Sequence, residues 1–368
     1  KRSVVCRGAA VPHADMVLWS QSGGTARGLV PCAAAHVLDS AVQQDGCIAA
    51  MRAFNAPYSM TLREIDAGGM YDTVVEEAGK TFVTTELGGG GTAWDSMVFA
   101  PAPNTLYVGT GNGSPWTREI RSPGGGDNLY LSSIIALDAD SGRMKWYYQT
   151  TPGDNWDYTA TQPLMLADIE IGGETRKVIM QAPKNGFFYV LDRMTGELIS
   201  ANPFSTVTWA SHVDLETGRP VETGEGEYGD RTAFVLPSAN GAHNWHPMAF
   251  SPETGLVYIP TQDIAGIYSL SEQWKNEGAF TPKKNWWNTG IDWTDYIDAI
   301  NALPEIPMEK GYLKAWDPAT GEMKWQAEYP APLNGGVLAT AGNLVFQGTA
   351  DGFFHAYNAA TGERVWSQ

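Results

Sequence analysis

A short motif recurs along this chain and restricts its possible folds more than any other feature. Its copies are I-A-L-D-A-D-S-G-R-M-K-W at 135–146, L-K-A-W-D-P-A-T-G-E-M-K-W at 313–325, F-H-A-Y-N-A-A-T-G-E-R-V-W at 354–366 and a partial copy, Y-V-L-D-R-M-T-G-E-L, at 189–198. The step from Asp317 to Asn358 is 41 residues, and the step from Trp325 to Trp366 is the same. Recurrence at this distance is typical of stacked or radial repeat architectures.

Each copy predicts two antiparallel strands joined by a tight turn. An apolar strand runs into Asp or Asn, whose side chain accepts hydrogen bonds from the backbone that follows, and a later Gly supplies left-handed backbone. The Trp that closes the motif is then able to place its ring between adjacent sheets. Residues 97–108 and 248–259 have the same strand–turn–strand pattern. The repeat therefore favours an all-β protein built from four-stranded blades, that is, a β-propeller.

The composition narrows the range of partners. The chain has 368 residues and a formal net charge of −17, which works against nucleic acid and anionic membranes as partners. No run of about 18 apolar residues occurs, so we expect no membrane-spanning helix. No signal peptide is recognisable in this chain, which starts at Lys1. The three cysteines, Cys6, Cys32 and Cys47, form neither C-x-x-C nor C-x-x-C-H, so zinc-ribbon and c-type haem sites are not expected.

The pattern divides the chain into unequal parts. Residues 1–80 lack the repeat and are left as an unassigned, irregular or atypical segment, whereas residues 81–368 are expected to form a partial propeller. Within the latter, an aromatic-rich stretch at about 264–309 breaks the rhythm and is interpreted as an insertion that covers one face. Its rings belong to Trp274, Trp286, Trp287, Trp293 and Tyr296.

Seven stretches follow one another in an order that matches one enzyme family. They are G-G-G-G-T-A-W-D-S at 88–96, V-G-T-G-N-G-S-P-W at 108–116, G-G-G-D-N-L-Y-L-S-S at 124–133, Q-T-T-P-G-D-N-W-D-Y-T-A at 149–160, Q-A-P-K-N-G-F-F-Y-V-L-D-R at 181–193, G-A-H-N-W-H-P-M at 241–248 and N-G-G-V-L-A-T at 334–340. On these stretches the chain resembles the quinoprotein alcohol dehydrogenases, which use pyrroloquinoline quinone (PQQ), and in particular their soluble quinohaemoprotein branch. The resemblance implies an eight-bladed propeller, which this chain is expected to carry incompletely.

The resemblance also implies a role for five residues. Trp94 matches the tryptophan on which the quinone stacks, and Lys184 matches a cation that hydrogen-bonds the quinone oxygens. Asn334 matches a further polar contact to the cofactor. Asn112 matches a side-chain ligand of a calcium ion, and Asp157 matches the carboxylate beside that ion, usually assigned as the general base. Oxygen ligands of this kind suit Ca²⁺.

Each of these residues also has an ordinary structural interpretation. Trp94 follows four glycines that let backbone approach a planar ligand, yet most tryptophans of such a fold pack between blades. Asn112 lies between two glycines and could serve the turn alone. Asp157, between two aromatic residues, could cap a turn, and Lys184 precedes a hairpin signal where lysines are usually solvated. Taken together, in the family's order, the five residues favour a cofactor site.

Two further residues raise the question of a zinc site. His243 and His246 are paired in H-N-W-H-P, but no third ligand follows at a suitable spacing, so a structural role is expected.

Relatives that use lanthanides have an Asp two positions after the catalytic one, and this chain has Thr159 there, which favours calcium.

The chain also departs from the family. It lacks the adjacent Cys-Cys pair and the upstream Glu ligand of calcium, and no haem domain is expected in it. The resemblance implies a periplasmic dehydrogenase that oxidises small alcohols to aldehydes or ketones with PQQ and Ca²⁺ and passes electrons to a cytochrome c-type acceptor. The alternative is a non-catalytic or truncated propeller that acts as an interaction scaffold.

Overall fold

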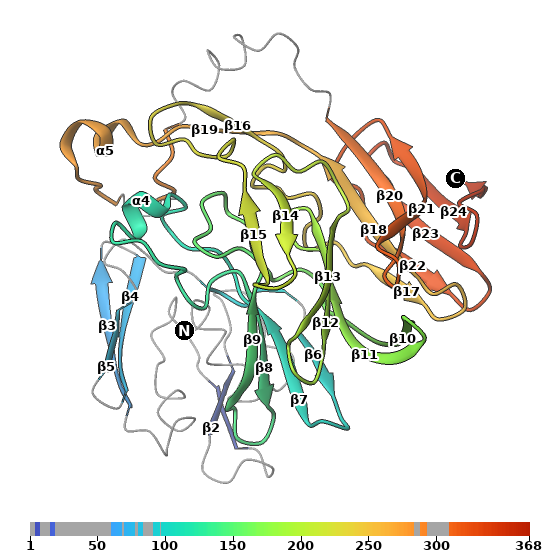
Figure 1. Cartoon of the computed structure of the whole chain (residues 1–368), viewed down its shortest axis with the longest axis horizontal. Coiled ribbons are helices and arrows are strands. Elements are labelled where there is room, and N and C mark those ends of the chain that lie inside the picture. The colour runs from blue at the N-terminus through green and yellow to red at the C-terminus, as the bar shows by residue number, and fades with distance from the viewer. Residues whose placement is uncertain are drawn as a thin grey trace. The chain divides into compact units, whose positions relative to one another are not determined.

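The structure is a computed structural model that describes residues 91–95, 97–282, 288–292 and 309–368, together with five strands at 4–7, 15–18, 60–67, 70–77 and 80–83. Figure 1 labels its helices and strands along the chain. The contacts within the chain divide it into two compact units. Unit 1 comprises Lys1–Asp157 and Ser271–Gly290, and unit 2 comprises Tyr158–Leu270 and Ile291–Gln368. Each unit is described by itself.

In the described part of unit 1 there is one four-stranded antiparallel sheet, in strand order β6 (Met97–Ala100), β7 (Thr105–Gly109), β8 (Ser133–Asp138) and β9 (Met144–Gln149). Its other strands are β1 (Val4–Arg7) with β2 (Asp15–Leu18), and β3 (Met60–Ala67), β4 (Met70–Glu77) and β5 (Lys80–Val83) in one three-stranded sheet. Its described helices are α4 (Arg118–Arg121) and α5 (Glu272–Glu277). Strands β7 and β8 are apolar and almost wholly buried, which places the core of the sheet at its centre.

Unit 2 contains three four-stranded antiparallel sheets. The first has the order β10 (Met165–Ile171), β11 (Glu174–Gln181), β12 (Phe187–Asp192) and β13 (Leu198–Pro203). The second has the order β17 (Ala249–Ser251), β18 (Leu256–Asp263), β20 (Lys310–Asp317) and β21 (Glu322–Tyr329). The third has the order β22 (Val337–Thr340), β23 (Leu344–Gly348), β24 (Phe354–Asn358) and β25 (Arg364–Ser367). Among its described residues the unit also has two two-stranded antiparallel sheets: the hairpin of β14 (Ala210–Asp214) with β15 (Arg219–Glu222), and β16 (Ala233–Val235) with the more distant β19 (Gly266–Tyr268).

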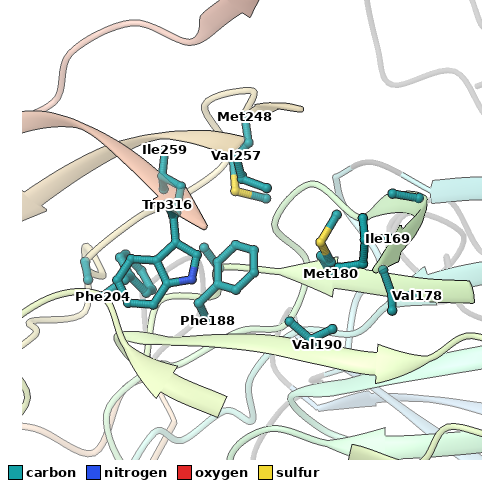
Figure 2. Close-up of a cluster of buried hydrophobic side chains, with 13 residues drawn as sticks. Ile169, Val178, Met180, Phe188, Val190, Phe204, Met248, Val257, Ile259 and Trp316 are labelled. Atoms are coloured by element: carbon teal, nitrogen blue, oxygen red, sulfur yellow. The ribbon is translucent and has the colours of Figure 1, made fainter. Parts of the chain in front are cut away.

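The first two sheets of unit 2 pack face to face through a shared apolar layer (Figure 2). Phe188 of β12 lies against Trp316 of β20, with ring centroids 5.9 Å apart. Met180 and Met248 fill the space beside these rings, and both are buried. Because burial of apolar surface contributes roughly 25 cal/mol per Å², layers of this kind hold neighbouring sheets together.

The turns of the repeat have the chemistry that the sequence predicts. In the 313–325 copy, Asp317 Oδ1 accepts hydrogen bonds from the backbone N–H of Ala319 at 3.0 Å and of Thr320 at 3.3 Å. Gly321 follows with a φ of +69°. Asn358 and Gly362 repeat the arrangement in the 354–366 copy, where φ of the glycine is +72°. The prediction of antiparallel hairpins joined by these turns is therefore confirmed.

The Trp that closes the motif connects one sheet to the next. Trp325 of β21 donates its indole N–H to the carbonyl oxygen of Ala359, which follows β24, at 2.9 Å. A Cβ atom on Gly362 would lie 2.6 Å from the same indole ring. Glycine is thus required twice at this position, by its backbone angle and by the ring that covers it. This contact confirms that a repeat Trp lies between adjacent sheets.

The hairpins expected at 97–108 and 248–259 are present as β6–β7 and β17–β18. The division at residue 80 and the insertion at 264–309 stay predictions. Trp274 lies in α5, but Trp286, Trp287, Trp293 and Tyr296 lie outside the described residues. None of the helices in the described part of the chain is both long and apolar enough to span a bilayer.

Candidate cofactor site

Trp94 presents its ring to solvent in unit 1. It is 44% exposed, whereas the preceding Ala93 is buried. Gly91 has a φ of +73°, which turns the glycine-rich segment before this residue. A Cβ on Gly111 would lie 3.7 Å from Trp94 Nε1 and 3.0 Å from the Thr92 carbonyl oxygen, so the two segments run in close contact. Trp94 is not one of the core rings, and its exposed face is free to receive a planar ligand.

The segment that carries Asn112 follows β7 and lies against the glycine-rich segment that leads to Trp94. Gly91 N–H donates to the Asn112 carbonyl oxygen at 2.9 Å. The Asn112 side chain is partly buried, and its Nδ2 donates to the Gly113 carbonyl oxygen at 2.9 Å. Its side-chain oxygen takes no part in that bond and is the atom that would serve a metal ion.

Asp157 lies in the irregular segment between β9 and β10, which is tied to helix α4. Its φ of +69° is in the left-handed region, which is uncommon for a residue with a side chain and typical of functional sites. Arg118 donates its backbone N–H to Asn155 Oδ1 at 2.8 Å, and its guanidinium lies 5.8 Å from the centre of the Trp156 ring. Helix α4 thus holds the backbone that leads to Asp157.

Arg121 joins this loop to the Asn112 segment. It is 7% exposed, and its Nη2 donates to the Asp154 carbonyl oxygen at 2.6 Å. Its Nη1 donates to the carbonyl oxygens of Pro115 and Trp116, each at 2.6 Å. A Cβ on Gly113 would lie 2.5 Å from Arg121 Cδ, so the side chain crosses the residue after Asn112. One buried guanidinium therefore fixes both segments that carry the predicted metal ligands.

Lys184 is buried in unit 2, with 6% of its surface exposed, so the solvated lysine of the ordinary interpretation is wrong. Its carbonyl oxygen accepts the Ala242 N–H at 3.0 Å. Gly241 has a φ of +78°, and a Cβ there would lie 2.5 Å from Lys184 Cγ. The 240–247 segment thus packs directly on the lysine stem.

Asn334 is also buried, and its side chain is held by backbone on both sides. Its Oδ1 accepts the Ala350 N–H at 2.9 Å, and its Nδ2 donates to the Ala331 carbonyl oxygen at 2.9 Å. The Nδ2 group has a second N–H, which could reach a ligand. Leu333, immediately before it, has a φ of +59° and is exposed. Asn334 thus has a structural role that the sequence did not reveal.

The segments around Lys184 and Asn334 meet at the 240–247 segment. Val337 N–H donates to the Pro247 carbonyl oxygen at 2.8 Å, and a Cβ on Gly336 would lie 2.5 Å from Pro247 Cδ. Gln262, at the end of β18, bonds to both sides: its Nε2 donates to the Gly241 carbonyl oxygen at 3.0 Å and its Oε1 accepts the Leu333 N–H at 3.0 Å.

His243 has the structural role that the sequence predicts, whereas for His246 that role stays a prediction. His243 is buried, with Nδ1 2.6 Å from the Ala182 carbonyl oxygen and Nε2 2.8 Å from the carbonyl oxygen of His246. Both ring nitrogens are thus occupied by backbone. Burial lowers the pKa of His243 to about 4, against the opposing effect of the two carbonyl oxygens. Trp245 between them is 55% exposed and stacks on His246, with ring centroids 4.2 Å apart.

The residues fit the implied groups in kind. An exposed indole and a buried lysine suit a flat polycarboxylate. Asn112 and Asp157 offer the oxygen donors that Ca²⁺ prefers, but Ca²⁺ takes six to eight of them, so these two are a partial set. Within the described ranges, no three side chains from among His, Cys, Asp and Glu gather closely enough to hold a metal ion. The remaining donors would have to come from elsewhere.

The structure therefore brings the segment of Asn112 against that of Trp94, and Arg121 bonds to both the segment after Asn112 and the segment before Asp157, all in unit 1. It separately joins Lys184 and Asn334 in one network in unit 2. The roles of these residues at a cofactor stay predictions. Arg121 and Gln262 were not anticipated, because a lone Arg or Gln in the sequence gives no sign of burial. The only available signal was the polar Thr-Gln pair that ends the apolar run of β18.

Sequence profiles connect this arrangement to a class of propeller dehydrogenases. Residues 52–208 match the β-propeller domain of glucose, ethanol and alcohol dehydrogenases, a match that begins inside the segment left unassigned by the sequence. Residues 309–368 match the profile of the outer membrane protein assembly factor BamB, and residues 4–98 match the catalytic domain of succinylglutamate desuccinylases and aspartoacylases.

Individual relatives define the family more closely. The chain is 54% identical over 295 residues to quinohemoprotein alcohol dehydrogenase ADH IIB of Pseudomonas putida, which covers 79% of this chain and 41% of that protein. It is 53% identical over 281 residues to the quinohemoprotein alcohol dehydrogenase of Comamonas testosteroni, covering 76% of this chain and 39% of that protein. The crystal structure of the enzyme from the latter organism superposes with a TM-score of 0.71 at 44% identity over 84% of this chain and 51% of that one.

Over the part that matches, the chain belongs to the family of PQQ-dependent quinohaemoprotein alcohol dehydrogenases. It has the propeller fold of that family, with several four-stranded sheets. The chain spans about 40% of the length of these curated relatives.

Proposed function

We propose that this chain provides part of the active site of a dehydrogenase that oxidises small alcohols to aldehydes or ketones with PQQ and Ca²⁺. The observation that carries the proposal is the exposed Trp94 ring, which lies against Gly111 next to Asn112, in a chain about half identical to alcohol dehydrogenases over the matched residues. We further propose a periplasmic location and a cytochrome c-type electron acceptor, on the resemblance alone.

Each of the five candidate residues has a separate proposed role in holding the cofactor, the metal ion or the proton. On the resemblance, Trp94 would supply an apolar platform for a planar ring, and Lys184 would donate hydrogen bonds to quinone oxygens. Asn112 and Asp157 would hold the calcium ion, and Asn334 would contact the cofactor through its remaining N–H. PQQ, when bound, would accept the two electrons that leave the alcohol. Asp157 would accept the proton of the alcohol hydroxyl, as a general base must lie within hydrogen-bond reach of that proton.

Reconstitution tests this proposal. The full chain is incubated with PQQ and Ca²⁺, quinone binding is followed by absorbance and by quenching of tryptophan fluorescence, and alcohol oxidation is followed with a redox dye. We expect PQQ-dependent turnover. The Asp157→Asn variant should bind PQQ with similar affinity but lose about 100- to 10,000-fold in kcat, the range expected for loss of a general base.

Two outcomes contradict the proposal in different ways. If wild-type chain binds PQQ but Asp157→Asn turns over at the wild-type rate, the cofactor stands and the assignment of the base is wrong. If neither PQQ binding nor turnover is found, the alternative remains, namely a non-catalytic propeller that serves as an interaction scaffold.

A further inference from the structure

Gln262 is a buried amide whose three hydrogen-bonding contacts all go to the segments around Lys184 and Asn334. It is 4% exposed and lies next to last in β18. Its Nε2 donates to the carbonyl oxygens of Asn240 at 3.2 Å and Gly241 at 3.0 Å, and its Oε1 accepts the Leu333 N–H at 3.0 Å. Only a primary amide donates twice and accepts at the same place.

On the lysine side, Gln262 holds the backbone that packs on Lys184. Gly241, whose carbonyl oxygen it binds, contacts the stem of Lys184 closely, with 2.5 Å from a built Cβ to Cγ. Ala242, the next residue, donates its N–H to the Lys184 carbonyl oxygen at 3.0 Å and accepts the backbone N–H of Gln262 at 2.8 Å. Side chain and backbone of Gln262 thus fix consecutive residues of one segment.

On the other side, Gln262 holds the residue that precedes Asn334. Leu333 has a φ of +59°, a left-handed angle that is unfavourable for a residue with a side chain. The bond from Leu333 N–H to Gln262 Oε1 favours this conformation. Leu333 directly precedes Asn334, so the bond from Gln262 restrains the backbone from which the Asn334 side chain extends. The bonds of that side chain to Ala331 and Ala350 then set the direction of its amide.

We propose that Gln262 is a positioning residue for the quinone end of the site: its amide sets the separation between Lys184 and Asn334. The proposal rests on the proposed function, in which these two residues contact PQQ. It adds a residue, placed 78 positions after Lys184 and 72 before Asn334, that touches neither the ligand nor the reacting atoms.

Two substitutions of Gln262 distinguish its contacts with the segment beside Lys184 from its contact with the residue before Asn334. Gln262→Met keeps the length of the side chain and removes all three bonds. Gln262→Glu, when ionised, retains an acceptor for Leu333 but places an oxygen against two carbonyl oxygens, so it selectively loses the side toward Lys184. The matched control is Thr261→Val on the same strand, because Thr261 is 3% exposed and its hydroxyl has no hydrogen-bond partner in the described structure.

The first measurement needs no cofactor. Backbone hydrogen–deuterium exchange is followed in the free chain at peptides covering 238–246 and 330–336. We expect Gln262→Met to speed exchange in both peptides, Gln262→Glu to speed it chiefly in 238–246, and Thr261→Val to leave both unchanged. Unchanged exchange in Gln262→Met would overturn the proposal, whether or not the chain binds PQQ.

The second measurement is PQQ affinity, at a temperature where every variant is folded by circular dichroism. We expect Gln262→Met to weaken binding about tenfold, equivalent to about 1.4 kcal/mol. In the double variant with Lys184→Met the combined loss should be smaller than the sum of the two single losses, because Gln262 acts through Lys184. Strictly additive losses would indicate a merely structural role and contradict positioning. If wild-type chain fails to bind PQQ, the proposed function fails while the exchange result still decides whether Gln262 organises this network.

Discussion

The two units organise their candidate site residues with different chemistry. In unit 1 a buried cation, Arg121, donates to backbone carbonyl oxygens in two segments, the one that follows Asn112 and the one that precedes Asp157. In unit 2 a buried neutral amide, Gln262, donates to one segment and accepts from the other. A guanidinium is always charged and cannot accept, whereas an amide is neutral and does both. Unit 1 thus depends on one buried charge, whereas unit 2 depends on a network of neutral hydrogen bonds.

The largest effect should follow from removing the guanidinium. Arg121→Met leaves the carbonyl oxygens of Pro115, Trp116 and Asp154 buried without their donor, and bonds to charged groups are the strong ones. We expect the free energy of unfolding to fall by about 3–5 kcal/mol, measured by urea denaturation. Gln262→Met should cost less, about 2 kcal/mol.

A control compares Arg121 with an arginine that is only partly buried, Arg193. Arg193 in unit 2 donates to the Ala167 carbonyl oxygen at 3.0 Å and pairs with Asp168, which is half exposed. Arg193→Lys should therefore change stability by less than about 1 kcal/mol, whereas Arg121→Lys, with one nitrogen in place of three, should lose several times more. Equal losses would remove the contrast between the units.

The fold could be predicted from the sequence to a far greater extent than the site. The Asp-to-Gly turns and the closing Trp are local or periodic features, so the roles of Asp317, Gly321 and Trp325 follow from the repeat itself. The assignment of Trp94 and Lys184 came from the resemblance alone. Periodicity says nothing about which backbone oxygens a buried side chain meets, because these come from segments distant in sequence. For that reason the sequence could not predict the contacts of Gln262.

Glycine substitutions test how closely each network is packed. Gly241→Ala should cost about 3 kcal/mol, because φ is +78° and the new methyl would meet Lys184 Cα at 2.7 Å and the His243 carbonyl oxygen at 2.6 Å. Gly113→Ala should cost about 1–2 kcal/mol, since its φ is not left-handed and it meets only side-chain atoms of Arg121 among its nearest neighbours. Thermal unfolding of both variants ranks them; a larger loss for Gly113→Ala would show that Arg121 is the more rigid neighbour.

Acid should loosen the network of unit 2. The pKa of His243 is about 4 in the folded chain and about 6.5 when unfolded, so the unfolded chain binds more protons between these values. Stability from this group is therefore lost as the pH falls from 6.5 towards 4, by about 2 kcal/mol at pH 5. Arg121 stays charged throughout, so unit 1 has no such dependence from its own anchoring residue.

The acid effect is measured by urea denaturation at pH 7 and pH 5, with His243→Gln as the control that should lose about 2 kcal/mol less than wild type over this interval. Hydrogen exchange at 238–246 should rise more at pH 5, after correction for intrinsic rates, than exchange at 111–121. If the two carbonyl oxygens beside His243 outweighed its burial, wild type would instead gain stability on acidification relative to His243→Gln.

The smallest effect on stability is expected for the exposed Trp94, in contrast to the buried Asn334. Trp94→Ala removes a ring that is 44% exposed, so the free energy of unfolding should change by less than about 1 kcal/mol while PQQ affinity falls about tenfold through lost stacking. Asn334→Ala should do the reverse: loss of its bonds to Ala331 and Ala350 costs about 1–3 kcal/mol, with a smaller loss of affinity from its single remaining N–H. Urea denaturation and PQQ titration of both variants measure these opposite effects on stability and on affinity. A Trp94→Ala chain that unfolds more readily yet binds PQQ normally would show that the ring packs within the protein, and unit 1 would then contribute no platform to the site.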